Sequence, residues 1–182
     1  MLTYEELPPK RRRRLLFQAL ARPVLSSVVM LVVYYLLPLD RPSSVILVAF
    51  GVGLLALGAM LLRQVRVVMA SPYPLLRAIE AVATMLPFFI LLFAAVFAAM
   101  SSHDPSAFTE ALGRTDALYF ALTVFATVGF GDIAAVTEAA RVAVIVQMTG
   151  NLIFVGLVAR VLVGAAQSAA YRSADRGRPP LP

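Results

Sequence analysis

Residues 115–133 read TDALYFALTVFATVGFGDI and decide the fold of this chain. The stretch is apolar but long enough for only about half of a membrane crossing, and it ends in the glycine-containing segment 127–132. Thr115 or Asp116 is a suitable N-cap for a helix that runs to about Ala126. A short apolar helix followed by irregular backbone is typical of a re-entrant segment, whose backbone must be shielded from lipid by protein or water.

The composition around this stretch is that of a membrane protein. Of the 182 residues, 60% are hydrophobic and 14% are charged, and the mean hydropathy is +0.85. A soluble domain of this size cannot bury so much apolar surface. The absence of cysteine excludes disulfides, thiolate metal sites and cysteine nucleophiles. The chain has one histidine and no paired carboxylates or nucleophile motif on a common face, so an enzyme is not expected.

Four longer apolar runs flank the re-entrant stretch, at 23–39, 44–62, 81–100 and 142–159. Each is close to the roughly 20 residues that a helix needs to cross the hydrocarbon core. We therefore predict an all-α membrane protein with four transmembrane helices, and a re-entrant helix between the third and the fourth. No arginine repeat lies inside 44–62, and Arg63 and Arg66 follow at its edge, so a voltage sensor of the arginine-repeat type is not expected.

The basic residues orient these helices. Arg41, Arg114 and Arg141 fall on one side, which leaves 13 of the 16 lysines and arginines on the other. Because cytoplasmic loops are enriched in these residues, both termini are predicted to be cytoplasmic. The arginine run 11–14 would be attracted to anionic lipids of the inner leaflet by about 1 kcal/mol per charge. Equally, these arginines would simply mark the cytoplasmic end of the first transmembrane helix. No folded basic face is formed, so nucleic acid is not an expected partner.

Two glycines alternate with larger residues in TVGFGD, 127–132. A cation that leaves water needs several oxygens at once, without a full negative charge that would hold it too tightly, and backbone carbonyls meet that need. Aiming successive carbonyls the same way requires alternating backbone handedness, which Gly129 and Gly131 allow at low steric cost. Val128 and Phe130 are then expected to point away, and Thr127 adds a hydroxyl at the inner end.

These residues, with Ala-Leu-Tyr-Phe at 117–120 before them and Ile133 after them, resemble the pore helix and selectivity filter of the potassium-channel P-loop family. The filter is similar to the variant with Phe where Tyr is commoner. The resemblance is specific over 116–133 and architectural over 81–164. It implies K⁺ coordination within a filter whose residues are Thr127, Val128, Gly129, Phe130 and Gly131. By the family's spacing, it also implies an outer vestibule at Asp132 and a cavity lined by Leu152, Val155 and Ala159.

The resemblance implies passive, K⁺-selective conduction across the plasma membrane, with K⁺ as the permeant ion and no small-molecule substrate. One such segment cannot surround an ion, so we predict a homotetramer with the pore on its symmetry axis. Two alternatives stay open, a weakly selective cation channel and a non-conducting tetraspanning scaffold or accessory subunit. The chain then divides into a basic N-terminus (1–22), two peripheral helices with a linker (23–80), a pore domain (81–165) and a cytoplasmic tail (166–182).

The sequence also predicts how the filter is braced. In many relatives a tryptophan hydrogen-bonds the filter from outside, but this chain has no tryptophan. Tyr119 and Phe120 stand at the corresponding positions, and Phe130 lacks a hydroxyl, so bracing is expected to depend mainly on packing. Asn151 is expected either to face the cavity or to bond a neighbouring helix.

Several local features carry smaller predictions. Asp104, Pro105 and Gly113 indicate the start and stop of a short outer helix. Arg77 and Glu80 are spaced for a weak pair along one helix. Two sets of predictions concern the last helix and the tail: bending or close packing at Gly150 and Gly156, and disorder from Ser173.

Overall fold

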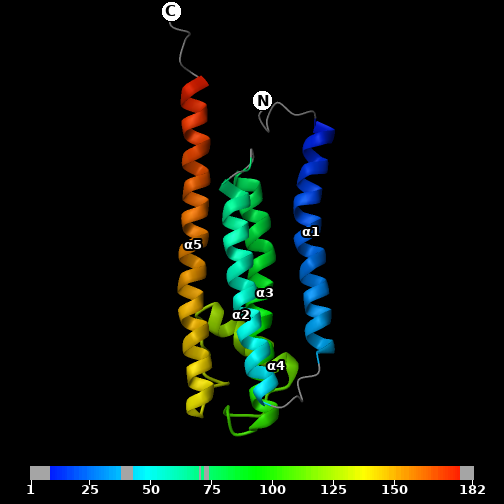
Figure 1. The fold of residues 1–182 in the computed structure, drawn as a ribbon, viewed down its shortest axis with the longest axis vertical. Helices are drawn as coiled ribbons and strands as arrows, with labels where there is room; N and C mark the ends of the chain where they lie inside the picture. The colour runs from blue at the N-terminus through cyan, green and yellow to red at the C-terminus, as the bar shows by residue number, and fades with distance from the viewer. Residues whose placement is uncertain (1–8, 38–42, 70, 72–73, 177–182) are drawn as a thin grey trace, which may run out of the picture.

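The structure is a computed structural model, which describes residues 9–37, 43–69, 71 and 74–176. Within these residues the chain is all-α, and the only β pairing is an isolated bridge between Phe108 and Ala135. In chain order the helices are α1 (Pro9–Leu36), α2 (Ser43–Met69), α3 (Pro74–His103), α4 (Arg114–Phe125) and α5 (Glu138–Arg176). Figure 1 shows four long helices side by side, with the short α4 near the end of the bundle opposite the start of α1.

Three stretches of the described residues are long and apolar enough to cross a membrane: Val48–Val68, Arg77–His103 and Glu138–Arg160. They overlap the second, third and fourth predicted crossings. The apolar part of α1 that the structure describes, Ala21–Leu36, is shorter, and positions 38 and 39 of the first predicted crossing lie outside the described residues. α1 begins and α5 ends at the same end of the bundle (Figure 1). The chain is therefore an all-α, multi-pass membrane protein.

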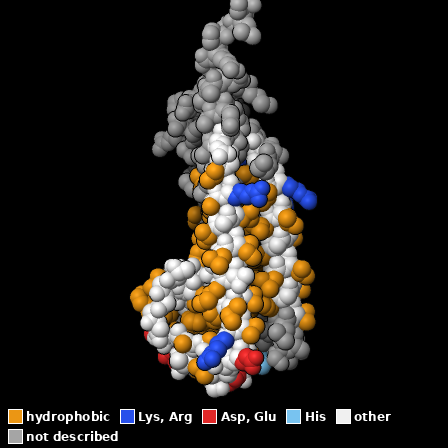
Figure 2. All heavy atoms as spheres, turned by 90° about the vertical axis from the view of Figure 1, so that its left-hand side faces the viewer, with side chains coloured by type: hydrophobic (Ala, Val, Ile, Leu, Met, Phe, Trp, Pro, Cys, Tyr) orange, Lys and Arg blue, Asp and Glu red, His pale blue; other side chains and the backbone are white. Residues whose placement is uncertain are grey.

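The outer surface of the bundle agrees with a lipid environment. Figure 2 shows apolar side chains over the middle of the described part, with basic side chains toward both ends and acidic side chains at the lower end. Large apolar side chains are exposed on each of the long helices that the apolar band crosses, among them Leu25, Leu55 and Ile145. In water this exposure would be unfavourable, whereas in the hydrocarbon core it is favourable.

α3 is the centre of the bundle, because it packs against each of α1, α2, α4 and α5. Its phenylalanine rings meet rings of the later helices. The ring centroids of Phe97 and Phe120 of α4 are 5.1 Å apart, and those of Phe89 and Phe154 of α5 are 5.8 Å apart. Since lipid tails supply no hydrophobic driving force between helices, such close packing is what holds them together.

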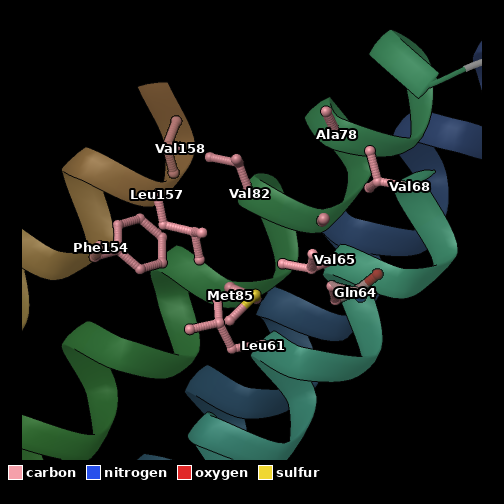
Figure 3. A pocket seen from close by; sticks show the side chains of 11 residues that line it. Leu61, Gln64, Val65, Val68, Ala78, Val82, Met85, Phe154, Leu157 and Val158 are labelled. Atoms are coloured by element: carbon pink, nitrogen blue, oxygen red, sulfur yellow. The ribbon is translucent and has the colours of Figure 1, made fainter. Parts of the chain in front are cut away.

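α2 comes close to α3 and α5 at the end of the bundle where α1 begins, as Figure 3 shows. The three helices enclose a cavity of about 30 Å³. This volume admits about one water molecule, whereas a second cavity between the same three helices, lined among others by Leu57, Phe89 and Ile153, measures about 380 Å³. The lining of the smaller cavity consists of Leu61, Gln64, Val65, Val68, Ala78, Ala81, Val82, Met85, Phe154, Leu157 and Val158.

Close packing explains one of the two glycines of α5. A Cβ atom at Gly150 would lie 3.0 Å from the ring of Phe89, whereas a Cβ atom at Gly156 would meet nothing within 4 Å. α5 is continuous through both positions. Of the two roles that the sequence left open for Gly150, the structure therefore supports close helix packing.

The predicted short outer helix is wrong, because residues 104–113 form a loop. The Asp104 carboxylate accepts hydrogen bonds from the backbone N–H of Ser106, at 2.9 Å, and from the Ser106 hydroxyl, at 2.5 Å. The N–H of Ala107 bonds the Asp104 carbonyl at 2.9 Å. These bonds close a turn. An aspartate side chain can stabilise either a turn or the start of a helix, and here it stabilises the turn.

The structure also tests the predicted Arg77–Glu80 pair and the predicted disorder from Ser173. The predicted pair on α3 is confirmed, because Arg77 Nη1 lies 2.7 Å from Glu80 Oε2. The predicted disorder from Ser173 is wrong over 173–176, where α5 continues as a helix to Arg176.

Candidate functional site

α4 is the short helix that the sequence predicted, but it begins earlier than expected. The N-cap is Gly113, and neither Thr115 nor Asp116 takes that position. Asp116 lies at the third helical position, where its Oδ2 accepts a hydrogen bond from the Gly113 N–H at 3.0 Å. The carboxylate therefore occupies the first turn, where the positive end of the helix dipole favours an acidic group.

The backbone that leaves α4 alternates in handedness. Within the described residues, positive φ angles occur at Thr127 (56°), Gly129 (55°) and Gly131 (81°), and not at Val128 or Phe130 between them. For a residue with a Cβ atom, this left-handed conformation costs about 1–2 kcal/mol, so the angle at Thr127 is strained. Strain that persists at one point of a chain is commonly found where the conformation serves a function.

The carbonyl oxygens of residues 127–131 accept no backbone or side-chain hydrogen bond from the part of the protein that the structure describes. The same five residues are exposed in the single chain. Five successive polar acceptors that the protein leaves free are available to a ligand that replaces water.

The residues after this segment are fixed by α4 and by the loop 104–113. The Tyr119 hydroxyl donates to Asp132 Oδ2 at 2.6 Å, and the ring of Tyr119 is parallel to that of Phe130, with centroids 6.5 Å apart. Thr109 donates its hydroxyl to the Asp132 carbonyl at 3.2 Å and accepts the N–H of Ala134 at 3.1 Å. The prediction that bracing depends mainly on packing is therefore wrong for the residues that follow the segment, because Tyr119 and Thr109 hold Asp132 and Ala134 through hydrogen bonds, whereas Tyr119 contacts Phe130 by ring packing.

The tyrosine hydroxyl also sets the ionisation of Asp132. It donates to the carboxylate and so stabilises the charged form, which lowers the pKa of Asp132 below its ordinary value. The backbone N–H of Ile133 acts in the same direction. Asp132 therefore keeps its negative charge into more acidic solution than an isolated aspartate would.

A Tyr119→Phe variant is expected to shift acid sensitivity. Loss of the hydroxyl removes the main group that favours the Asp132 carboxylate, so the pKa of Asp132 rises and acid neutralises it at a higher pH. We expect flux through the reconstituted protein to fall at a higher external pH in this variant than in the wild type. An Asp132→Asn variant is the control, since it has no carboxylate to titrate. An unchanged pH midpoint in Tyr119→Phe would contradict the assignment of the Tyr119 hydroxyl as the group that lowers the pKa of Asp132.

Two buried amides attach α5 to the C-terminal half of α4. Gln147 Nε2 donates to the Ala121 carbonyl at 2.8 Å, and Asn151 Nδ2 donates to the Val124 carbonyl at 3.1 Å. The two side chains are one helical turn apart, and Gln147 is 0% exposed. Of the two environments that the sequence left open for Asn151, the structure shows the bond to a neighbouring helix. The side-chain oxygens Gln147 Oε1 and Asn151 Oδ1 are buried without a partner among the described residues.

A Gln147→Met variant is expected to leave thermal stability unchanged or to raise it. The substitution loses one hydrogen bond, worth about 0.5–1.5 kcal/mol, and removes an unpaired buried oxygen that costs about 1–3 kcal/mol. The measurement is the unfolding midpoint of purified protein, with Gln64→Met of α2 as the matched control. A loss of more than about 2 kcal/mol would show that Gln147 Oε1 has a partner in the assembled protein.

The three predicted cavity residues lie on an uncovered part of α5. Leu152 is 77% exposed, Val155 is 57% exposed and Ala159 is also exposed. Their side chains are apolar, while the polar Asn151 beside them is buried against α4. In one chain nothing among the described residues covers this face.

The fold and the site together define a class: a multi-pass membrane protein in which a short helix and a strained, acceptor-rich segment lie between two long helices. Residues 85–168 match the family model described as "Ion channel". The match supports an ion-channel pore family of the potassium-channel type for this part of the chain, in agreement with the resemblance seen in the sequence. The match covers most of α3, all of α4 and most of α5, and it leaves α1 and α2 outside. No curated protein and no solved structure matches the chain.

Sequence reasoning missed three residues that support the site. Thr109 bonds the Asp132 carbonyl and the Ala134 N–H, and Arg114 and Tyr34 connect α4 with α1. Neither a loop threonine nor a single arginine at a helix start carries a pattern that predicts a distant partner. The tyrosine pair at 34 and 35, at the outer end of the first apolar run, is the one signal that could have been noticed, because tyrosines gather at membrane interfaces.

Proposed function

We propose that this ion channel is a homotetramer that conducts K⁺ selectively and passively through a filter formed by residues 127–131. The observation that carries the proposal is the combination of alternating positive φ angles with five carbonyl oxygens that accept no hydrogen bond from the described protein. A dehydrated K⁺ ion needs several neutral oxygens around it, and backbone carbonyls in such an array supply them. The family match supports the wider function of ion conduction.

A geometric argument supports the proposed assembly. One segment presents its carbonyls from one side only, so several copies must face a common axis before an ion is surrounded. Four copies would place Leu152, Val155 and Ala159 along a central cavity and cover the exposed face of α5. The C-terminal ends of four α4 helices, each equivalent to roughly half a negative charge, would then favour a cation in that cavity.

The surroundings of the filter also favour cations. Asp132, whose pKa is lowered further by the hydrogen bond from Tyr119, would form a ring of negative charge at the outer mouth. We propose the plasma membrane as the location, with both termini cytoplasmic, from the distribution of lysine and arginine. The described charges of α2 are Arg63 and Arg66 near its end, so we do not propose gating by an arginine-repeat voltage sensor.

The test is cation flux from purified full-length protein in liposomes. We expect K⁺ efflux well above that of empty liposomes, much smaller Na⁺ flux under the same gradient, and a cross-linked mass of four chains. Near-equal K⁺ and Na⁺ permeability would favour a weakly selective cation channel. Absence of any flux from a correctly inserted tetramer would favour the non-conducting scaffold.

A further inference from the structure

The outer end of α1 is bonded to the start of α4, although the two segments are 80 positions apart. Arg114 Nη1 donates to the Tyr34 carbonyl at 2.8 Å, and Arg114 Nη2 donates to the Leu37 carbonyl at 2.6 Å. In return the Tyr34 hydroxyl donates to the Arg114 carbonyl at 2.5 Å. Next to this pair, the Tyr35 hydroxyl lies 3.1 Å from Thr115 Oγ1. We call this group of contacts the α1–α4 clamp.

The chemistry of the clamp suits the end of a helix. The last carbonyls of α1 have no partner within their own helix, and a guanidinium offers several donors in a fixed planar arrangement. Its positive charge also interacts favourably with the negative end of the α1 dipole. Tyr34 is only 2% exposed, so its hydroxyl needs a partner, and the Arg114 carbonyl provides it. Arg114 thus serves two helices at once, as the first residue of α4 and as the C-terminal cap of α1.

The clamp lies at one end of the helix that leads into the filter segment. α4 is 12 residues long and regular, and its last residue, Phe125, is followed after one position by Thr127. The other end of α4 is fixed by Gln147 and Asn151 of α5. A rigid helix that is held at both ends transmits a displacement at its start to the segment at its end.

We infer that Arg114 is a positioning residue for the filter and that α1, which lies outside the matched pore segment, is an outer brace of the conduction path. This inference rests on the function proposed above. When the clamp is intact, α4 keeps the orientation in which the carbonyls of residues 127–131 converge. When the clamp opens, the start of α4 is released from α1 and the carbonyls of residues 127–131 no longer converge in a fixed arrangement. Discrimination between K⁺ and Na⁺ then falls.

The test compares four full-length variants in liposomes. Arg114→Gln removes the guanidinium, Arg114→Lys keeps the charge but offers one donor group, and Tyr34→Phe removes only the phenolic hydroxyl. Arg141→Gln is the matched control, because Arg141 is also an arginine near this end of the bundle, but its guanidinium bonds, among the described residues, only the nearby Ala135 carbonyl, at 3.3 Å. The readouts are the K⁺-to-Na⁺ flux ratio and amide hydrogen exchange of peptides that cover residues 114–135.

In Arg114→Gln we expect amide exchange over residues 114–120 and 127–131 to rise about tenfold, as the loss of two hydrogen bonds allows. We expect the K⁺-to-Na⁺ flux ratio to fall severalfold, with smaller effects in Arg114→Lys and Tyr34→Phe and none in Arg141→Gln. If Arg114→Gln does not insert, Tyr34→Phe carries the comparison.

The inference is overturned if the clamp variants match Arg141→Gln in filter exchange. Hydrogen exchange requires no conduction, so it decides the inference even if the wild type passes no K⁺. A wild type without K⁺ flux would overturn the proposed function instead. A wild type that conducts, with clamp variants of unchanged flux ratio and unchanged filter exchange, would overturn the inference alone.

Discussion

Alanine in place of Gly129 is expected to abolish K⁺ flux while leaving the assembled protein intact. Gly129 has a φ angle of 55°, and a Cβ atom there would meet nothing within 4 Å of the same chain. The expected effect therefore comes from the backbone and not from a clash. An alanine in this region is less stable by about 1–2 kcal/mol, and a tetramer carries the substitution four times.

The relaxation available to the substituted alanine is a return to negative φ, which turns its carbonyl away from the direction shared by its neighbours. Thr127 and Gly131 flank this position with positive φ angles of their own, so one reversal breaks the alternation in the middle. The measurement is K⁺ efflux from liposomes together with the cross-linked mass of the complex. Gly51→Ala is the control, because Gly51 lies within α2 and also has free space around its Cβ position. Conduction at the wild-type rate in Gly129→Ala would show that residues 127–131 do not form the conduction path.

Alanine in place of Phe97 is expected to cause the largest loss of stability. Phe97 is fully buried in α3, and its ring lies 5.1 Å from that of Phe120 in α4 and 5.8 Å from that of Phe108 in the loop 104–113. Removal of a buried phenylalanine ring costs about 3–5 kcal/mol, because the cavity that it leaves closes only in part. We therefore expect a much lower unfolding temperature, and a loop 104–113 that no longer holds its contacts with residues 134–136.

The control for Phe97 is Phe88→Ala, which removes the same ring from the same helix at a position that is only partly buried. We expect Phe88→Ala to lower the unfolding midpoint by less than half as much. Equal losses in the two variants would mean that the aromatic cluster around Phe97 contributes no more than lipid-facing packing does.

The features that could be predicted from the sequence are those that depend on neighbouring residues. The positions of the long apolar helices follow from local hydropathy. The apolar stretch before Gly129 is long enough for only about half of a membrane crossing, and this predicts that α4 is short. The alternating φ angles at Gly129 and Gly131 follow from glycine's freedom to adopt both hands, while the strained angle at Thr127 does not follow from residue type. That these residues coordinate K⁺ stays a prediction until flux is measured.

The features that could not be predicted depend on contacts between distant residues or on competition between local alternatives. In the sequence Arg114 is only a charge on the outer side, and nothing in its neighbourhood indicates that it caps α1. Asp104 has the side chain of a helix start, but its carboxylate is occupied by Ser106 in a turn. The position of Tyr119 beside residues 127–131 follows from its spacing, yet its hydrogen bond to Asp132 depends on how the chain turns back after Gly131.

The α1–α4 clamp also has a consequence for the order in which the protein is made. A chain is synthesised from its N-terminus, so α1 reaches the membrane long before Arg114 exists. Until then the carbonyls of Tyr34 and Leu37 must be satisfied by water or lipid headgroups. Ribosome-bound chains that end before residue 114 should therefore lack this cap even after α1 has packed against α3, and the cap should form only in chains long enough for residue 114 to have left the ribosome. The C-terminal end of α1 is thus made early, but its cap is completed only after α4 has emerged.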